Sequence, residues 1–290
     1  MKSKSKESPG EKLNYLNFCL MVMEPISGIR LLLLILTRMN FSFRMPFRLS
    51  LVFVFPFLFS LQGKTQTRYF TTIFPGISVS SPFSDKSELN LSSSAQYNTL
   101  AREYDGTSYP AAFNYVDFQI GAVYKYNQHM HIAAAWYYRN TDPGRSSSFS
   151  ENRFWQQVTF ISRIGNLRFR NRLRMEERLI TRNGRTEPLK WRLRYQTGFE
   201  IPLQGEKTDI KEFYAVLLNE AYFSLSKPRS AFYGENWISA VLGYRISAKS
   251  RLEVGPAWQN QIRNTEKEKN NLIHLQANLL IQTNFLKKNH

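Results

Sequence analysis

The sequence has little of what several protein classes depend on. Cys19 is its only cysteine, and the four histidines are scattered, so no Cys/His cluster suggests a zinc site. A chain that lacks cysteine beyond its N-terminal region fits an oxidising compartment. No stretch repeats apolar residues convincingly with the helical period of 3.6. The mean hydropathy of −0.40 excludes a bundle of transmembrane helices, although it leaves a membrane β-barrel possible.

The chain is strongly basic, with 39 Lys and Arg against 22 Asp and Glu and a net charge of +17. Such a balance indicates nucleic-acid binding when the basic residues form an exposed run or a known motif. Here the arginines instead alternate with large apolar residues. We therefore expect no nucleic-acid partner and look for a sheet that keeps its charges on one face.

A leader precedes the alternating segments. The basic segment Met45–Arg48 is followed by an apolar run over 49–59, which is the pattern of a secretory signal peptide. The run is short for a membrane helix, and a proline interrupts it. We predict a signal peptide over 45–66, with cleavage between Gly63 and Gln66.

Residues 1–44 fit poorly in front of a signal peptide. They combine a polar, Lys-rich opening with a separate leucine-rich run. Our hypothesis is that translation begins at Met39 or Met45 and that 1–44 is a mis-annotated or disordered extension. The alternative is a transmembrane anchor near residues 13–37.

The most informative segment is Leu167–Ile180. From Arg168 to Arg178 every second residue is charged, and the residues between are apolar except Asn171 and Glu177. A period of two is typical of a β-strand whose two faces meet different surroundings. The alternation recurs from about residue 85 onward, and the aromatic content of 14% also favours strands.

These segments predict an all-β protein, an antiparallel transmembrane β-barrel of ten strands after a cleaved signal peptide. Its domains are a lead-in over 67–86, the barrel over 87–285 and a tail over 286–290. Outer-membrane barrels have short periplasmic turns and longer outer loops, which here puts both ends of the barrel in the periplasm. A further hairpin that includes Ile73–Ser80 is the alternative, and it would make twelve strands. We place the ten strands at 87–99, 113–126, 129–140, 153–164, 167–181, 189–202, 212–225, 235–247, 251–262 and 271–285.

The charged rows are expected to face the interior. Buried charges have to be paired or hydrated, and a barrel of this size is narrow enough for side chains to fill. We therefore expect a largely occluded lumen. An anion-selective path lined by Arg172, Arg174, Arg192 and Arg194 is the alternative. The predicted lumen network consists of Arg168, Arg170, Arg172, Arg174, Glu176, Arg178, Arg192, Arg194, Glu200, Glu220 and Glu253.

Two hairpins suggest a register for the network. A two-residue turn is predicted at Gly165–Asn166. The next hairpin would place Glu176 opposite Arg194 and Arg170 opposite Glu200. A soluble barrel would show the same alternation turned inside out, with charges in water and apolar residues in the core. The many large apolar side chains favour the membrane arrangement, because a small core would struggle to hold them.

Six segments in combination resemble one family. That family is an uncharacterised group of Gram-negative outer-membrane barrels known as domain of unknown function 2490, and the similarity covers roughly residues 70–285. It implies a membrane-embedded barrel in the outer membrane of a Gram-negative bacterium, and no catalytic residue. The chain departs from the family at Gly255-Pro256, where the proline implies a bulge or irregular edge. The segments are ENRFWQQ (151–157), RFRNRLRMEERL (168–179), RLRYQTGFEIPL (192–203), LNEAYF (218–223), NWISAVLGYRI (236–246) and RLEVGPAWQ (251–259).

The expected function is that of an integral outer-membrane β-barrel with a structural, binding or minor transport role. Its expected partners are outer-membrane lipid and, during biogenesis, the outer-membrane assembly machinery, whose signal the last strand Leu272–Phe285 resembles. No cofactor is expected. A lipid-modifying enzyme is a further alternative, with His274 as its best candidate base. No serine nucleophile and orienting group can be assembled around that histidine, so the residues favour a protein that is not an enzyme.

Overall fold

The computed structural model describes residues 67–226, 232–262 and 269–284. The predicted extension and leader over 1–66, and the tail over 286–290, lie outside these ranges. All described residues belong to the unit Gly63–His290. They form strands, turns and loops, and none of their segments is a helix long and apolar enough to span a membrane. In chain order the strands are β1 Thr67–Pro82, β2 Ser87–Asn98, β3 Arg102–Tyr104, β4 Thr107–Tyr109, β5 Phe113–Lys125, β6 Met130–Thr141, β7 Phe149–Ile164, β8 Leu167–Arg182, β9 Arg185–Thr186, β10 Lys190–Pro202, β11 Phe213–Ser224, β12 Tyr233–Tyr244, β13 Ser250–Ile262 and β14 Lys269–Gln282.

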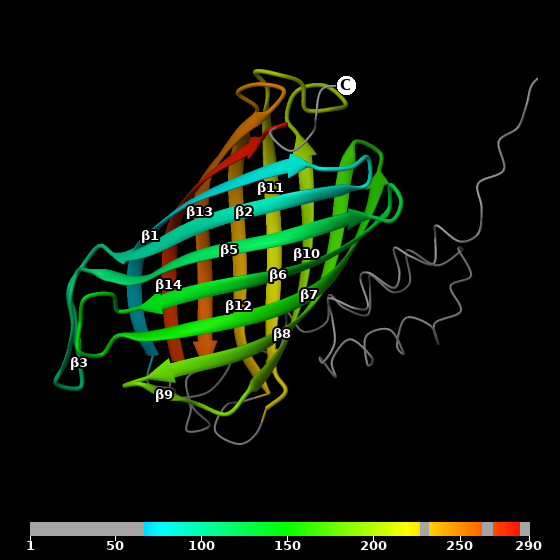
Figure 1. Cartoon of the computed structure of the whole chain (residues 1–290). Helices are drawn as coiled ribbons and strands as arrows, with labels where there is room; N and C mark the ends of the chain where they lie inside the picture. The colour runs from blue at the N-terminus through cyan, green and yellow to red at the C-terminus, as the bar shows by residue number, and fades with distance from the viewer. Residues whose placement is uncertain (1–66, 227–231, 263–268, 285–290) are drawn as a thin grey trace, which may run out of the picture. The chain divides into compact units, whose positions relative to one another are not determined.

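Eleven of the described strands close into a barrel (Figure 1). Around it the order is β1, β2, β5, β6, β7, β8, β10, β11, β12, β13 and β14, and β14 returns to β1. β1 and β14 pair in parallel, whereas the other neighbours in the barrel pair antiparallel. β9 extends the hairpin after β8, and β3 with β4 forms a separate hairpin.

The predicted strand numbers, ten and twelve, are both wrong. Each of the ten predicted strands is present, and β1 is an eleventh, in the segment that the sequence assigned to a lead-in. Its inward row includes Thr72, Gly76 and Ser78, so it lacks the charged alternation that marks β8. An odd number of strands makes the first and last strands parallel. β2 begins and β14 ends at the same end of the barrel, as predicted for the ten strands. The additional strand β1 begins at the opposite end, so Thr67 and Gln282 lie at opposite ends.

The strands are strongly tilted. Following paired residues once around the barrel from Arg68 leads back to β1 at Pro82, a displacement of 14 residues along the strand (68 to 82). Barrels with such a stagger have strands tilted by roughly 35–45° from the axis. With eleven strands the interior is narrow, and long side chains from one wall can reach far across it.

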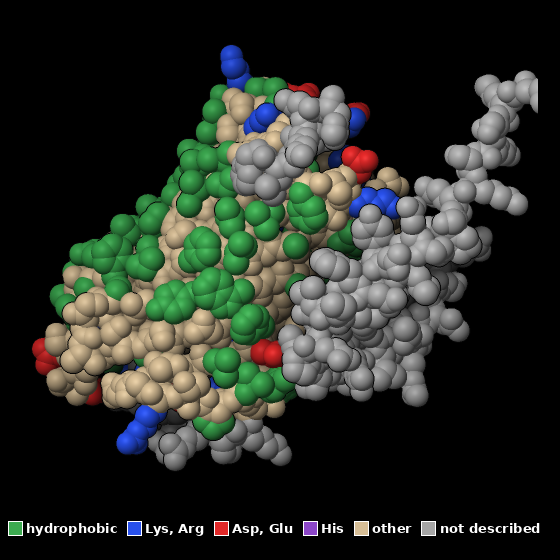
Figure 2. Space-filling model, in the orientation of Figure 1, with side chains coloured by type: hydrophobic (Ala, Val, Ile, Leu, Met, Phe, Trp, Pro, Cys, Tyr) green, Lys and Arg blue, Asp and Glu red, His purple; other side chains and the backbone are tan. Residues whose placement is uncertain are grey.

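The two faces of the sheet differ in composition. Outward-facing Phe118, Leu242 and Leu275 are 41%, 50% and 55% exposed, whereas inward-facing Arg153 and Glu176 are 4% and 1% exposed. On the face drawn in Figure 2, hydrophobic side chains spread over the strands, and charged side chains lie mainly near the ends. The barrel thus has a charged interior and an apolar exterior, which is the reverse of a water-soluble barrel.

Residues with positive φ close two of the hairpins. Gly165 has a φ of 62°, and the predicted two-residue turn Gly165–Asn166 is confirmed. After β8, Asn183 and Gly184 have φ angles of 49° and 73°. A two-residue hairpin turn of this type needs positive φ at both central positions, which asparagine and glycine tolerate best. This second turn comes slightly earlier in the chain than the sequence suggested, where it was placed near Arg185.

The register between β8 and β10 consequently differs from the prediction by two residues. Glu176 lies opposite Arg192 rather than Arg194, and the second predicted pair, Arg170 with Glu200, is displaced in the same way. Because the side-chain period of a strand is two, a slip of two residues keeps every side chain on its face. The charged rows therefore still point inward, with different direct partners.

Pro256 interrupts the ladder between β12 and β13. Pairing passes from Ser239–Ala257 to Leu242–Val254 without a change of register. A proline has no N–H to donate to the ladder, which accounts for the gap. The irregularity predicted here is confirmed, as a gap rather than a bulge.

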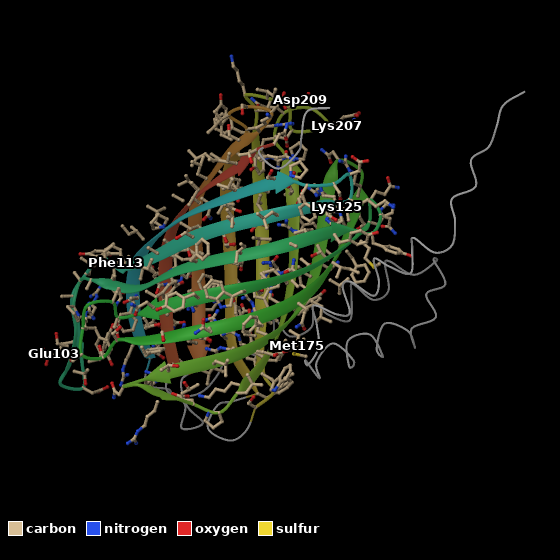
Figure 3. All side chains as sticks on the ribbon, in the orientation of Figure 1. Glu103, Phe113, Lys125, Met175, Lys207 and Asp209 are labelled. Carbon is tan, nitrogen blue, oxygen red and sulfur yellow. The ribbon has the colours of Figure 1, made fainter. Side chains whose placement is uncertain are left out.

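The two ends of the barrel carry different connections. We call them the short-turn end and the long-loop end. Figure 3 shows Lys125, Lys207 and Asp209 at the short-turn end, and Glu103 and Phe113 at the long-loop end. The short-turn end holds connections 83–86, 126–129, 165–166 and 245–249 and the longer 203–212, while the long-loop end holds 99–112, 142–148 and 183–189.

Candidate functional site

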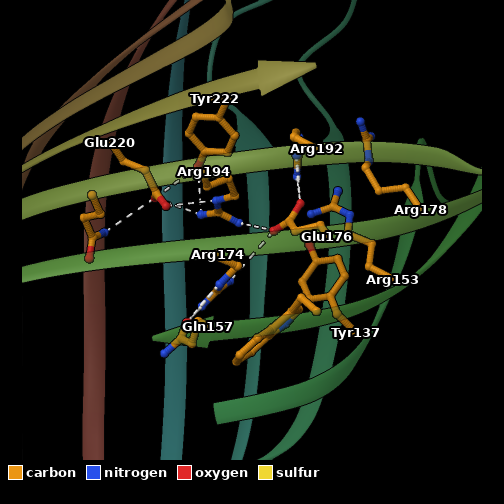
Figure 4. Close-up of polar contacts among 12 residues, drawn as sticks. Tyr137, Arg153, Gln157, Arg174, Glu176, Arg178, Arg192, Arg194, Glu220 and Tyr222 are labelled. Atoms are coloured by element: carbon orange, nitrogen blue, oxygen red, sulfur yellow. Dashed lines mark hydrogen bonds and ion pairs between the residues drawn. The ribbon is translucent and has the colours of Figure 1, made fainter. Parts of the chain in front are cut away.

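Ion pairs between the inward rows of neighbouring strands form one network inside the barrel (Figure 4). The rows belong to β8, β10 and β11, which are neighbours around the wall, and β7 adds Gln157 as a neutral partner. Each row contributes long polar side chains at every second residue, so the guanidinium groups of one strand reach the carboxylates of the next. We call the network the arginine belt; its members are Arg172, Arg174, Glu176, Arg192, Arg194 and Glu220.

Glu176 is the most enclosed acid of the belt. Its Oε2 accepts hydrogen bonds from Nε and Nη2 of Arg192, at 2.8 and 2.5 Å, and its Oε1 accepts one from Nη1 of Arg194 at 2.7 Å. Both oxygens are thus bound by guanidinium groups. Because a buried carboxylate without such partners costs several kcal/mol, these arginines are what allow Glu176 to be ionised in the lumen.

Arg194 joins Glu176 to the second acid of the belt. Its Nε and Nη2 donate to the two oxygens of Glu220 at 2.9 and 2.8 Å, and Nη2 also donates to the hydroxyl of Tyr222 at 2.9 Å. Arg172 donates from Nη2 to Glu220 at 2.6 Å. Arg194 therefore bonds Glu176 as the sequence suggested, but diagonally and not as its direct cross-strand partner.

Arg174 is held by neutral groups more than by acids. Its Nε and Nη2 donate to Oε1 of Gln157 at 3.0 and 2.7 Å, and its guanidinium carbon lies 3.9 Å from the ring centroid of Trp155. The nearest carboxylate, Glu176, is 3.9 Å from its Nη1. An amide acceptor and a cation–π contact together replace a full ion pair.

Two further clusters extend the polar network. Arg153 donates to both oxygens of Glu151 at 2.7 and 2.9 Å, and Arg178 also bonds this acid. In the second cluster, Asp117 accepts a hydrogen bond of 2.7 Å from the Tyr137 hydroxyl and another from Arg139. The hairpin at Gly165–Asn166 places Arg153 on the same face as the arginine row, as the sequence predicts. The predicted network did not include Glu151, Asp117, Tyr137 or Arg139, because its candidates came from the strands with the most regular alternation.

Solvent access to the lumen along this wall ends at the arginine belt. From the short-turn end inward, the exposed fraction of the side chain falls from 36% at Arg168 to 17% at Arg172, 10% at Arg174 and 1% at Glu176. It rises again to 22% at Arg178. A water-filled passage along this wall would leave all of these side chains accessible, so the belt occludes it. The part of the lumen open to the short-turn end is called the vestibule below.

The wall opposite the belt is built from short neutral side chains. β1 and β14 lie five strands from β8 in either direction around the barrel. Their inward rows, together with that of β2, border a cavity of about 200 Å³. The small side chains leave this space where the long arginines of the other wall do not reach. Lumen-facing residues at the cavity are Phe74, Gly76, Ser78, Ser92, Ser94, Asp117, Asn278 and Leu280.

The remaining predicted members of the network lie in the vestibule. Glu200 lies 3.6 Å from Arg168 and 3.9 Å from Arg251, and Glu253 accepts a hydrogen bond of 2.9 Å from the Tyr214 hydroxyl. Arg170, between the belt and the vestibule mouth, has no such contact among the described residues. The eleven predicted residues therefore divide between an occluding belt with its flanking pairs and a more open vestibule.

His274 is fully buried on the neutral wall, beside the β1–β14 seam. Its Nδ1 lies 2.5 Å from the Thr72 hydroxyl and 3.3 Å from Nε2 of Gln96, and its Nε2 lies 2.8 Å from Oε1 of Gln259. Trp237 stacks on the ring with centroids 4.9 Å apart. The partner hydroxyl could not be identified beforehand, because β1 lacked the pattern of a strand.

This cluster does not form an accessible catalytic group. Thr72 is 1% exposed and His274 0% exposed, so a substrate cannot reach the hydroxyl in this structure. The other neighbour of the ring, Gln259, is neutral, whereas a histidine that acts as a base is usually oriented by an acid. The described residues also contain no group of three or more His, Cys, Asp or Glu that could hold a metal ion.

Comparison with known proteins gives one match. A family model described as "Protein of unknown function (DUF2490)" matches residues 71–271, which is more than half of the chain. The chain belongs to the DUF2490 family. No curated protein and no solved structure matches.

The residues matched by the DUF2490 family model include some features of the lumen and leave out others. The match begins within β1 and ends within β14, so it includes the arginine belt, the vestibule and Thr72. His274 lies just beyond its end. The family is thus shown for the strands that build the charged wall, and its description assigns no function to them.

Proposed function

We propose that this protein is an integral outer-membrane β-barrel whose lumen is occluded by the arginine belt, and that it has a structural or binding role. The observation that carries the proposal is the inverted distribution of side chains, with charge inside and apolar residues outside. Water-soluble monomers rarely expose a contiguous apolar patch larger than a few hundred Å². Here outward apolar residues are exposed around the barrel, for example Ile73 on β1, Ile120 on β5 and Leu217 on β11.

Aromatic residues near both ends support a membrane position. Tyr124 and Phe213 are exposed toward the short-turn end, and Tyr69 and Phe113 toward the long-loop end. Tyrosine, with an apolar body and a polar tip, favours the two interfaces of a bilayer, and membrane barrels carry girdles of aromatic residues there. The apolar strand surface between these residues would then face the hydrocarbon.

The proposed orientation follows from the connections. Outer-membrane barrels have short periplasmic turns and longer outer loops, so the short-turn end would face the periplasm. The vestibule would then open toward the periplasm, and β1 would begin at the outer surface. Export through the signal peptide predicted at 45–66, and insertion by the outer-membrane assembly machinery, belong to the same proposal.

A bilayer measurement tests the occlusion. Because ion-paired side chains of the belt close the charged wall, the purified protein should give no steady current in a planar bilayer. A stable anion-selective current would contradict the occluded lumen and restore the channel alternative. The burial of His274 removes the best candidate base of the lipid-modifying alternative.

Fractionation tests the location separately. The full chain, expressed in a Gram-negative host, should remain in the outer-membrane pellet after an alkaline carbonate wash. It should also shift its gel mobility on heating, as folded membrane barrels do. Release into the soluble periplasmic fraction would refute the membrane assignment, whatever the conductance result.

A further inference from the structure

One inward-facing cation of the vestibule is attracted by acids only from beyond ion-pair distance. Arg170 lies on β8 between Arg168 and Arg172, and its direct cross-strand partner on β10 is Gly198, which has no side chain. Among the described residues, Arg170 makes no hydrogen bond and no ion pair. A guanidinium in a narrow lumen has to be hydrated or paired with an anion, since an isolated charge is costly in low dielectric.

The nearby acids are already engaged. Glu200 lies within ion-pair distance of Arg168 and Arg251, at 3.6 and 3.9 Å. Glu253 accepts a hydrogen bond of 2.9 Å from the hydroxyl of Tyr214. Arg168, Arg170 and Arg251 outnumber Glu200 and Glu253 in the vestibule. Both acids attract Arg170, but only from beyond ion-pair distance.

A second donor near Arg170 is also unsatisfied. Arg172 uses Nη2 to bond Glu220 at 2.6 Å, but its Nε is buried without a hydrogen-bond partner. Arg170 and Arg172 are two residues apart on the same face of one strand, so their guanidinium groups project into the same region. Two neighbouring guanidinium groups with free donors are a recurrent means of binding anions.

A small hollow lies beside Arg170. The hollow, of about 10 Å³, is bordered by Arg168, Arg170, Gly198 and Glu200. That volume is close to the least that one water molecule needs, on the order of 10–15 Å³. Leu218 occupies the space that a side chain at Gly198 would take. An ion larger than a water molecule would therefore extend from the hollow into the open vestibule. Exposure of the wall decreases from Arg168 inward, so an ion would enter from the short-turn end.

We propose that Arg170 and Arg172 form a binding site for a small inorganic anion, a halide or an oxyanion such as phosphate, at the bottom of the vestibule. The anion supplies the negative charge that no acid provides within ion-pair distance of Arg170. It accepts hydrogen bonds from both guanidinium groups. The site differs from the conducting path considered from the sequence, because the belt ends the path just beyond it. The proposal deepens the binding role proposed above but does not depend on the membrane location.

The test uses the purified, folded chain in neutral detergent. Chloride or inorganic phosphate is exchanged for a bulky organic anion at constant ionic strength, and the unfolding temperature is followed. Arg170→Gln removes the proposed ligand-binding cation. Arg185→Gln, which removes an exposed arginine at the other end of the barrel, is the matched control.

The proposal expects that chloride or phosphate raises the unfolding temperature of the wild type and of R185Q in a saturable manner, since a ligand that binds only the folded state stabilises it. R170Q should need at least tenfold more anion for the same shift. The more effective anion distinguishes a halide site from an oxyanion site. An equal shift in all three proteins, or no saturable shift in the wild type, would overturn the proposal.

Two further measurements keep the test decisive if R170Q folds poorly. Arg170→Lys keeps the charge but loses the planar fork, and should bind the anion more weakly than the wild type yet more tightly than R170Q. Chloride binding to the wild type can also be followed by broadening of its nuclear resonance, which phosphate should reverse by competition. Absence of saturable broadening together with an unchanged unfolding temperature would refute the site. These readouts are independent of fractionation and of bilayer conductance, so the anion site and the proposed function can fail separately.

Discussion

The two walls of the lumen fill the interior with different kinds of side chain. On β7, β8, β10 and β11, long charged side chains interlock through hydrogen-bonded ion pairs. On β14, β1 and β2, serine, threonine, asparagine and histidine side chains bond locally, and space is left beside Gly76. A narrow barrel has room for long inward side chains on one wall only if the facing wall is small.

The comparison indicates where the stability of the interior is concentrated. In the arginine belt each acid serves two or three arginines, so one substitution leaves several buried charges without partners. On the neutral wall a substitution removes one hydrogen bond and leaves the rest in place. We therefore expect large, coupled effects on the charged wall and small, separate effects on the neutral wall.

The largest effect is expected for Glu176→Gln. This change leaves Arg192 and Arg194 without the carboxylate that both of them bind. Removing one partner of a buried ion pair typically costs about 3–5 kcal/mol of unfolding free energy. Reversible urea unfolding in detergent or lipid measures it. Glu206→Gln, in the exposed connection between β10 and β11, is the control and should change little.

Arg194→Ala should have the next largest effect. It removes the link between Glu176 and Glu220, but Arg192 and Arg172 still bind these acids, so we expect a loss of roughly 1–3 kcal/mol. Arg194→Lys should also destabilise, because a lysine cannot donate to both acids with a planar fork. If both variants keep the heat resistance of the wild type on a gel, the diagonal pairing described for Arg194 is wrong.

On the neutral wall, Thr72→Val should cost only about 1 kcal/mol. Valine keeps the shape of threonine but cannot bond Nδ1 of His274, while Gln96 remains within reach of that atom. Thr71→Val, one residue earlier and facing outward, is the matched control. A loss as large as that of Glu176→Gln would remove the proposed distinction between the walls.

The smallest effect concerns the pH dependence of a loop charge outside both walls. A hydrogen bond from Lys190 at 2.5 Å, and a second one from Arg182, lower the pKa of Glu187. A carboxyl whose pKa is lowered on folding stabilises the protein at pH values above its ordinary pKa, and the contribution disappears as the pH falls through the lowered pKa. Because Glu187 is partly exposed, the contribution should be below about 1 kcal/mol. Thermal unfolding followed from neutral to acidic pH should show that Glu187→Gln removes this part of the acid sensitivity; an unchanged profile would contradict it.

The strands differ in how well the sequence predicts them. β8 was predictable because its charged residues recur at every second position, and the hairpin at Gly165–Asn166 was predictable because glycine tolerates positive φ. Of β1, the sequence offered only Ile73–Ser80, as part of an alternative hairpin, since the inward residues of this strand apart from Arg68 carry no charge. The partners of Thr72 and His274 depend on the parallel seam that β1 forms, and a period-two pattern carries no information about that seam.

The sequence by itself determined which side chains share a face, because the alternation of a strand is local and survives a slip of two residues. It also determined the all-β class and ten of the eleven strands. Only the tertiary structure decided how many strands close the barrel, which carboxylate each arginine binds and that Arg170 forms no ion pair. Those outcomes depend on register, tilt and the reach of long side chains across a narrow lumen. They are set by closure of the whole sheet and not by any single strand.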